Sequence, residues 1–365
     1  MQLKFIHTAD WQLGKKFLNF EDEEIITNLR QKRFATVKKI AELATKYQVN
    51  AVLVAGDVFD SNDLSNKILR QALNAMQDYN GKWILLPGNH DPATNNSVWH
   101  RIVDLSEKTQ NIICATKQEV LEFDNWQLLV APLQQKYAAH DLTQYFTSHI
   151  KKDKFMIALA HGSIDSFTLN QNNIIKLENL QHLDYVALGD WHGMKQINDK
   201  IFYSGTPEAD RFPKTAQQLG QVLLVTLETN KLPKVKNLKT GYFDWHNLNY
   251  EIFNKQNILT LNSNLSKYEP QEKQIIKLTV TGSLSLCLQN ELHEVLEKWQ
   301  AKFAMLQVKN NIINILNKNT DFTNINDFNK QLLLNLENIS KNPQHPQQLI
   351  AQQAIQLLWH TINKN

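Results

Sequence analysis

The segment Leu86-Pro87-Gly88-Asn89-His90-Asp91 is the most informative stretch of this chain about its fold. It continues the apolar run Trp83–Leu86, which is typical of a buried strand, and it places an amide and an imidazole where that strand ends. The glycine lets the backbone turn sharply and come close to a ligand. In open α/β sheets, ligands gather outside the carboxyl ends of the strands. The segment therefore predicts a ligand site at the edge of a sheet.

Four other apolar runs end in the same way. The runs and the polar residues that follow them are Phe5–His7 with Asp10 and Gln12, Ala51–Ala55 with Asp57, Ile157–Ala160 with His161, and Val186–Leu188 with Asp190 and His192. Amphipathic helical patterns at about 23–47 and 64–78 separate the first three runs. Strands and helices at this spacing predict an α/β sheet with helices on its faces. If all five strands share that sheet, their loops converge on one point.

The residue types in these loops indicate which ligand they suit. Aspartate, asparagine, glutamine and histidine without cysteine form a mixed oxygen and nitrogen shell, which suits Mn²⁺, iron or Zn²⁺. The set is too large for one ion and fits two. In two-metal sites the ions lie roughly 3.5–4 Å apart and clamp the attacking and leaving oxygens of a phosphoryl displacement. Asp57 is the simplest bridging carboxylate.

Composition restricts the class of protein. The 365 residues, 42% of them hydrophobic and 21% charged, exclude a mostly disordered chain and favour a main domain plus an appendage. No apolar run approaches the roughly 20 residues that cross a bilayer, and the start lacks the layout of a secretory signal. With only Cys114 and Cys287, a disulfide scaffold is not expected. We therefore expect a cytoplasmic protein without a membrane partner, and a net charge of +3 leaves nucleic-acid binding open.

The rest of the chain divides by pattern. Strands are expected at 111–115, 126–131, 155–160, 185–188, 201–203 and 221–227, in one mixed sheet or two stacked sheets. Near residue 250 the content of asparagine, glutamine and lysine rises. A strand at 274–281, a helix at 291–303 and a strand at 305–313 then predict a small βαβ-like unit, followed by a helical tail. We divide the chain into residues 1–245, 246–318 and 319–365.

Taken together, the motifs D-x-Q, G-D-x-F-D, G-N-H-D, H-G and G-D-x-H-G resemble those of the metallophosphoesterase (calcineurin-like) superfamily. Within it, the chain is most similar to the Mre/SbcD-type DNA repair exonucleases over roughly its first two-thirds. The segments that carry this likeness are His7–Trp11, Ala55–Asp60, Pro87–Asp91 and Tyr203–Glu208. The resemblance implies an α/β fold, in which a β-sandwich flanked by helices carries the metals. It also implies a small C-terminal α+β cap domain, which binds DNA, and a helical tail.

The resemblance also implies roles for single residues. One metal would be held by Asp10, Gln12, Asp57 and His192, and the other by Asp57, Asn89, His161 and Asp190. His90 would stay off the metals and stabilise the transition state or protonate the leaving oxygen, with Asp91 orienting its ring. The family has histidine where Gln12 and Asp190 stand. The replacements make the ligand set harder, which favours Mn²⁺ or Mg²⁺ over Zn²⁺.

The activity implied is that of a metal-dependent DNA exo/endonuclease working by a two-metal mechanism. Two alternatives remain: a phosphatase or cyclic-nucleotide phosphodiesterase on the same core, and a catalytically weak DNA-end-binding subunit. Lys15, Lys16 and Arg211 are candidates for contacts with the DNA backbone. Trp11 and Trp191 either pack under their loops or offer a surface to a base. Apolar helical stripes in the tail, together with the resemblance, suggest an SbcC-like coiled-coil ATPase as a partner, and the family implies a homodimer.

Overall fold

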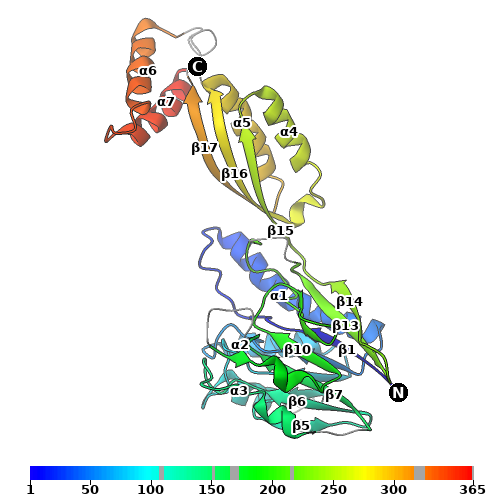
Figure 1. Cartoon of the computed structure of the whole chain (residues 1–365). Helices are drawn as coiled ribbons and strands as arrows, with labels where there is room; N and C mark the ends of the chain where they lie inside the picture. Colours follow the sequence, from blue (N-terminus) through cyan, green and yellow to red (C-terminus); the bar gives the residue numbers. More distant parts are fainter. Residues whose placement is uncertain (107–110, 150–152, 165–171, 214–217, 316–324, 364–365) are drawn as a thin grey trace. The chain divides into compact units, whose positions relative to one another are not determined.

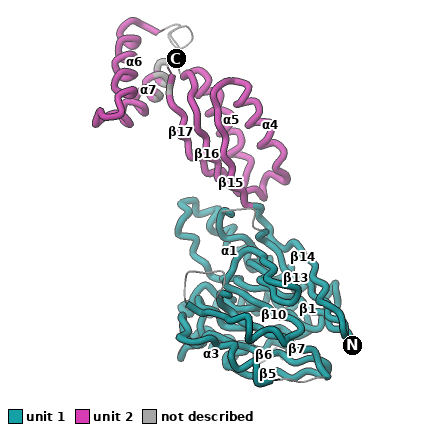
Figure 2. Tube along the Cα trace, viewed as in Figure 1, with its two compact units in different colours: residues 1–244 teal, residues 245–365 magenta. Residues whose placement is uncertain are grey.

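The chain forms two compact units in the computed structural model (Figures 1 and 2). They comprise Met1–Asp244 and Trp245–Asn365. The structure describes residues 1–106, 111–149, 153–164, 172–213, 218–315 and 325–363. The domain boundary that we placed between residues 318 and 319 lies outside these ranges.

Two six-stranded sheets make up the first unit. The first sheet has the order β14 (Lys234–Lys239), β13 (Gln221–Glu228), β1 (Gln2–Thr8), β2 (Ala51–Val54), β3 (Lys82–Leu85) and β4 (Ile112–Cys114). Strands β1 to β4 are parallel, and β13 runs antiparallel to β1. The parallel pairing of β1, β2 and β3 follows from the helices that connect them, because a parallel pair needs a crossover.

The second sheet is also mostly parallel. Its order is β11 (Lys195–Gln196), β12 (Ile201–Tyr203), β10 (Tyr185–Gly189), β7 (Phe155–His161), β6 (Trp126–Ala131) and β5 (Glu119–Glu122). Only the edge strands β11 and β5 pair antiparallel. A two-stranded pair, β8 (Ser163–Ile164) and β9 (Ile174–Ile175), follows β7 in the chain.

The sheets pack face to face around one buried core. Leu3, Leu53 and Ile84 from the first sheet meet Leu128, Ile157 and Phe202 from the second in this core. His7 of β1 links the two sheets, because its ring nitrogens lie 3.0 Å from the Tyr185 hydroxyl and 3.1 Å from the Leu188 carbonyl. The predicted α/β sandwich is confirmed, and of the two arrangements left open by the sequence, one mixed sheet or two stacked sheets, the structure has the second.

Helices cover the outer face of the first sheet. They are α1 (Glu23–Lys46), α2 (Asn66–Met76) and α3 (Val98–Ser106), all packed on it through a second core (Figure 1). Asp22 caps α1 by accepting from the backbone N–H groups of Glu24 and Ile25. On the outer face of the second sheet, a third core includes the short 3₁₀ helices η1 (Gln144–Ser148) and η3 (Leu177–Leu180).

The second unit contains a three-stranded sheet with the order β15 (Asp244–Ile252), β16 (Gln274–Ser285) and β17 (Met305–Ile315). Helices α4 (Lys255–Leu265) and α5 (Leu286–Gln300) pack on it, and β16, α5 and β17 form the expected parallel βαβ unit. Helix α5 begins at Leu286, five residues before the predicted start, because the Ser285 hydroxyl caps it. The sequence prediction also missed β15 and α4.

Two further helices complete the second unit. They are α6 (Asp327–Ser340) and α7 (Gln348–Asn363), and a small core joins them to α5 through Leu286, Leu333 and Ile355. Among the described residues, every helix is too short or too polar to cross a lipid bilayer.

Candidate metal centre

The candidate ligands follow strands of both sheets. Asp10, Asp57 and Asn89 come after β1, β2 and β3 of the first sheet. His161 ends β7, and Asp190 follows β10 of the second sheet. Since these strands belong to two packed sheets, the site lies where one end of the sandwich brings both sets of loops together.

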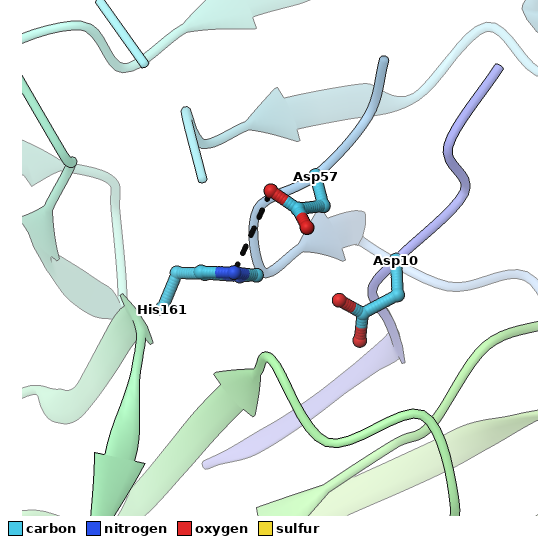
Figure 3. A group of neighbouring side chains, drawn as sticks. All are labelled: Asp10, Asp57 and His161. Atoms are coloured by element: carbon cyan, nitrogen blue, oxygen red, sulfur yellow. Dashed lines mark ion pairs between the residues drawn. The ribbon is translucent and has the colours of Figure 1, made fainter. Parts of the chain in front are cut away.

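Three of the candidates converge tightly. One ligand atom each of Asp10, Asp57 and His161 lies within 4.8 Å of the other two, and all three residues are buried. Figure 3 shows their side chains pointing toward a common space, with the ion pair of Asp57 and His161 drawn. The distance from Asp57 Oδ1 to His161 Nε2 in that pair is 3.5 Å. This group fits a divalent cation, because one carboxylate from each of two loops and an imidazole face the same point.

Asn89 and Asp190 extend this group. The His161 ring donates from Nδ1 to the Ala55 carbonyl at 2.8 Å, which turns Nε2 toward the Asn89 side-chain amide at 3.0 Å. Asp190 Oδ1 lies 3.9 Å from the same Nε2. The other oxygen, Oδ2, accepts a 2.7 Å hydrogen bond from the Ser163 hydroxyl. Asp190 therefore directs one oxygen, Oδ1, toward the group, as a histidine would direct one ring nitrogen.

Gln12 and His192 form a second pair beside it. Gln12 Nε2 lies 3.4 Å from His192 Nε2. The side-chain oxygen of Gln12 accepts a 2.7 Å hydrogen bond from Lys15. His192 Nδ1 lies 3.1 Å from the carboxylate of Asp210, a residue to which the sequence prediction gave no role.

Backbone conformation singles out the same loops. Four of the candidate ligands have positive φ angles, namely Asp10 (55°), Gln12 (43°), Asp57 (52°) and Asp190 (103°). A non-glycine residue in this region costs on the order of 1–3 kcal/mol and persists only where its surroundings hold it. The backbone of these loops is therefore strained, and the strain, which lowers the stability of the fold, directs the candidate ligands toward one another.

Two glycines allow this close approach. Gly56 has a φ of +87°, and a Cβ atom there would lie 2.2 Å from His161 Nδ1. A Cβ atom on Gly88 would lie 2.1 Å from Asp57 Oδ1. Any side chain at either position would displace a candidate ligand, so the glycines of the G-D and G-N-H-D motifs are required by packing.

The electrostatics of the group also favour a bound cation. Burial raises the pKa of Asp10 to about 6, and the Asp57 and Asp190 carboxylates add to that rise. Among the described residues, the backbone N–H of Asp190 alone donates to the Asp10 carboxylate, at 3.3 Å to each oxygen. Burial opposes the charge of His161, but Asp57, Asp10 and Asp190 outweigh it and raise its pKa to about 9. A buried carboxylate with so few donors fits a metal ligand.

These pKa shifts predict that a divalent cation such as Mn²⁺ binds more weakly as pH falls. Bound metal must displace a proton from His161 below pH 9, and from Asp10 as well below pH 6. Each proton displaced costs about tenfold in affinity per pH unit, so His161 contributes about 100-fold and Asp10 about a further threefold. We therefore expect binding about 300-fold weaker at pH 5.5 than at pH 7.5. Isothermal titration calorimetry at both pH values measures the change. A change below threefold would contradict the assignment of His161 as a ligand.

His90 lies at the rim of the group. Its ring is partly exposed, with Nδ1 at 3.1 Å from the Asp60 carbonyl and Nε2 at 4.0 Å from Asp57 Oδ2. The expectation that Asp91 orients this ring is wrong. Both Asp91 carboxylate oxygens accept backbone hydrogen bonds, from Gly88 at 2.7 Å and Phe59 at 2.8 Å. Asp91 thus holds the G-N-H-D turn, and Asp60 contacts the ring.

The candidate DNA contacts differ in their surroundings. Lys16 is exposed. Lys15 is largely buried between Gln12 and Asp210, whose carboxylate it meets at 2.9 Å. Arg211 is exposed and also pairs with Asp210. Of the two tryptophans, Trp11 packs in the core against Trp83, whereas Trp191 is 41% exposed beneath the Lys195 ammonium, 5.1 Å from its ring centre.

Two buried charged residues beside the candidate ligands escaped the sequence analysis. Asp210 is buried, and although burial opposes its charge, His192, Arg211 and Lys15 hold its pKa well below the usual range. Arg33 of α1 is buried too and donates to the carbonyls of Trp11 and Asp10, at 2.7 and 3.2 Å. The sequence did contain a sign of Arg33. It lies midway between Leu29 and Val37, four residues from each, and so places a charged residue on the buried face of the helix. The sequence held no comparable signal for Asp210.

Comparison with known families defines the class. Residues 3–194, more than half of the chain, match the family described as calcineurin-like phosphoesterase. The chain belongs to this family and is a hydrolase of phosphate esters, in which divalent metals serve the reaction.

Similarity to individual proteins is more specific. The chain is 21% identical over 282 residues to the SbcD component of the nuclease SbcCD of Escherichia coli strain K12, covering 65% of this chain and 68% of the relative. It is 24% identical over 264 residues to the Staphylococcus epidermidis protein of the same name, covering 63% and 67%. It is 21% identical over 309 residues to the DNA double-strand break repair protein Mre11 of Thermoplasma acidophilum, covering 77% of each chain.

Proposed function

We propose that this protein is a metal-dependent DNA exo/endonuclease of the repair type, which hydrolyses phosphodiester bonds. The convergence of Asp10, Asp57 and His161 at one end of the sandwich carries the proposal, because it supplies a buried cation site on a phosphoesterase fold. The names of the relatives, a nuclease component and a double-strand break repair protein, support DNA as the substrate.

The proposed cofactor is a pair of divalent ions, most simply Mn²⁺. Asp57, Asn89, His161 and Asp190 would hold one ion, and Asp10, Gln12, Asp57 and His192 the other. When bound, the metals supply positive charge that stabilises the phosphoryl oxygens in the transition state. The exchange of two imidazoles for an amide and a carboxylate favours Mn²⁺ or Mg²⁺ over Zn²⁺. A full zinc complement in protein purified without added metal would contradict this preference.

The proposed general acid is His90. Its Nδ1–H donates to the Asp60 carbonyl, so that Nε2 faces the rim of the metal group and can carry the proton for a leaving oxygen. The ring is held at one end by a backbone carbonyl and exposed at the other. A substrate phosphate can therefore reach Nε2 without displacing a protein side chain.

Replacing His90 with alanine should lower DNA cleavage by about 100-fold or more, the usual contribution of a general acid. Mn²⁺ affinity should stay within about threefold, because His90 is not a proposed ligand. The measurement is cleavage of a labelled linear duplex in Mn²⁺, in Mg²⁺ and in EDTA, with calorimetry of Mn²⁺ binding. His100→Ala is the matched control, since His100 is an exposed histidine ten residues along the chain.

The same assay separates the alternative functions. Turnover of a nitrophenyl phosphate monoester that exceeds DNA cleavage would favour a phosphatase. DNA binding without cleavage in any metal would favour an end-binding protein, and reversion of Gln12 and Asp190 to histidine would then be the next test.

The remaining assignments complete the proposal. Residues 1–245 form the nuclease domain, with Lys15, Lys16 and Arg211 toward DNA, and residues 246–318 form a DNA-binding cap. Residues 319–365 bind a partner such as an SbcC-like coiled-coil ATPase. Exposed apolar side chains on α6 and α7 support this role, namely Phe328, Leu349, Ile350 and Leu357. A homodimer in the cytoplasm is the proposed state.

A further inference from the structure

Asp210 is a buried carboxylate beside the metal group, and it is not one of the proposed ligands. Its side chain is 1% exposed, yet four donor contacts reach it. Oδ1 lies 3.1 Å from His192 Nδ1 and accepts from Arg211 Nε at 2.9 Å. Oδ2 accepts from Arg211 Nη2 and Lys15 Nζ, both at 2.9 Å. A charged carboxylate this deeply buried is stable only when hydrogen-bonded, positively charged partners compensate for the loss of water.

The contact with His192 determines which ring nitrogen can bind a metal. A neutral imidazole carries one hydrogen, and the nitrogen without it is the ligand. Arg211 Nη2 also lies 3.0 Å from His192 Nδ1, but it is a donor already bonded to Asp210. The carboxylate is the acceptor at this nitrogen, and hydrogen bonds to a charged acceptor are roughly twice as strong as neutral ones. The hydrogen therefore stays on Nδ1, and Nε2 presents its lone pair toward Gln12.

The contact with Lys15 reaches the second neutral ligand. The Lys15 ammonium bridges Asp210 Oδ2 and the side-chain oxygen of Gln12, at 2.9 and 2.7 Å. This bridge fixes the rotation of the Gln12 amide, whose nitrogen lies on the side of His192. A carbonyl oxygen has two lone pairs, so the Gln12 oxygen can accept from Lys15 and still face a cation.

We propose that Asp210 is a positioning residue of the metal centre, which selects the Nδ1–H tautomer of His192 and, through Lys15, fixes the oxygen of Gln12. One carboxylate thus orients both uncharged ligands of that metal position, His192 and Gln12. Hydrogen-bond partners that orient metal ligands typically contribute 10- to 100-fold to metal affinity. The inference rests on the proposed metal roles of Gln12 and His192.

The first test reads the tautomer in full-length protein labelled with ¹⁵N-histidine, free of metal. Long-range ¹H–¹⁵N spectra should show His192 with its hydrogen on Nδ1, and His192→Gln identifies the signals. Asp210→Ala should move the hydrogen to Nε2, and Lys15→Met should leave it on Nδ1. Hydrogen on Nε2 in the unsubstituted protein, or no change in Asp210→Ala, would overturn the proposal.

The second test is Mn²⁺ calorimetry on the same proteins. We expect Asp210→Ala to weaken one bound ion by about 10- to 100-fold, and Lys15→Met to weaken it less. Asp141→Ala is the matched control, since Asp141 also accepts four hydrogen bonds, from Thr143, Lys176 and Asn179, but contacts none of the proposed ligands. Equal losses in Asp141→Ala and Asp210→Ala would contradict a positioning role.

A variant that keeps the shape of the Asp210 side chain tests the proposal even if Asp210→Ala fails to fold. Asp210→Asn retains an oxygen for His192 Nδ1–H and removes the charge that holds Lys15. It should keep the tautomer and lose part of the Mn²⁺ affinity, whereas a switched tautomer with unchanged affinity would refute the proposal. A protein that shows the Nδ1–H tautomer and binds Mn²⁺ but cuts no DNA would refute the proposed function and leave Asp210 in its role.

Discussion

Asp57→Asn should abolish phosphodiesterase activity, by at least about 10⁴-fold. Asp57 is the carboxylate shared by both proposed metal positions, and it lies 3.5 Å from His161. A lost metal removes several kcal/mol of transition-state stabilisation, and each 1.36 kcal/mol is a factor of ten in rate. The fold should survive, because the asparagine oxygen can still accept from the His90 backbone N–H, which donates to Asp57 Oδ1 at 2.9 Å.

Thermal unfolding with and without Mn²⁺ tests the same substitution independently of activity. A ligand at 100 times its dissociation constant stabilises the folded protein by about 2.7 kcal/mol. For the unsubstituted protein this raises Tm by about 5–10 °C, at about 2–4 °C per kcal/mol. Asp57→Asn should lose this rise, whereas Asp63→Asn, an exposed aspartate in the same loop, should keep it. A full Mn²⁺-dependent rise in Asp57→Asn would refute the shared-ligand assignment.

Arg33→Met should destabilise the first unit by about 3–5 kcal/mol. The buried guanidinium donates to the carbonyls of Trp11, Glu208 and Asp10, at 2.7, 3.1 and 3.2 Å. It therefore ties helix α1 to the two loops that carry Asp10 and Asp210. Methionine has nearly the same helix propensity as arginine, so the loss reflects the missing donors. The Thr206 hydroxyl can still donate to one of the Asp10 and Glu208 carbonyls, which it meets at 2.9 and 2.8 Å. Two buried carbonyls therefore lose their donor, and each costs about 1–3 kcal/mol.

Urea unfolding of the metal-free protein, followed by tryptophan fluorescence, measures this loss. Arg30→Met is the matched control on the same helix, one turn earlier. Arg30 donates to the carbonyls of Lys15 and Lys16 from an exposed position, where water can replace it. We expect that control to cost less than about 1 kcal/mol. Equal losses for Arg33→Met and Arg30→Met would show that α1 is not tied to the site through Arg33.

The elements that the sequence predicted well are those with an unbroken pattern. The run Trp126–Ala131 and the stripe of α1 appear in the structure within a residue of their expected bounds. Strand β15 and helix α4 were missed, because the asparagine, glutamine and lysine residues between their apolar side chains obscure both periodic patterns. The start of α5 was misplaced because a capping serine, rather than the apolar stripe, sets it.

Within the site, the sequence indicated residue types more reliably than contacts. Its pattern predicted that Asp10, Asp57 and His161 would converge, and the structure brings them together. The orientation of His90 was assigned to its neighbour Asp91, but adjacent residues in a turn need not touch. Asp91 points into the protein to meet Gly88 and Phe59, and Asp60 contacts the ring instead.

That polar, metal-type side chains follow buried strands could be predicted from the sequence, since strand period and loop chemistry are local properties of the chain. That these loops come from two sheets, and that Asp210, Lys15 and Arg33 contact them, became apparent from the folded structure. Asp210 and His192 are 18 residues apart, and Arg33 and Glu208 are 175 apart. Contacts across such separations arise from the packing of the sandwich and of α1, which no local pattern encodes.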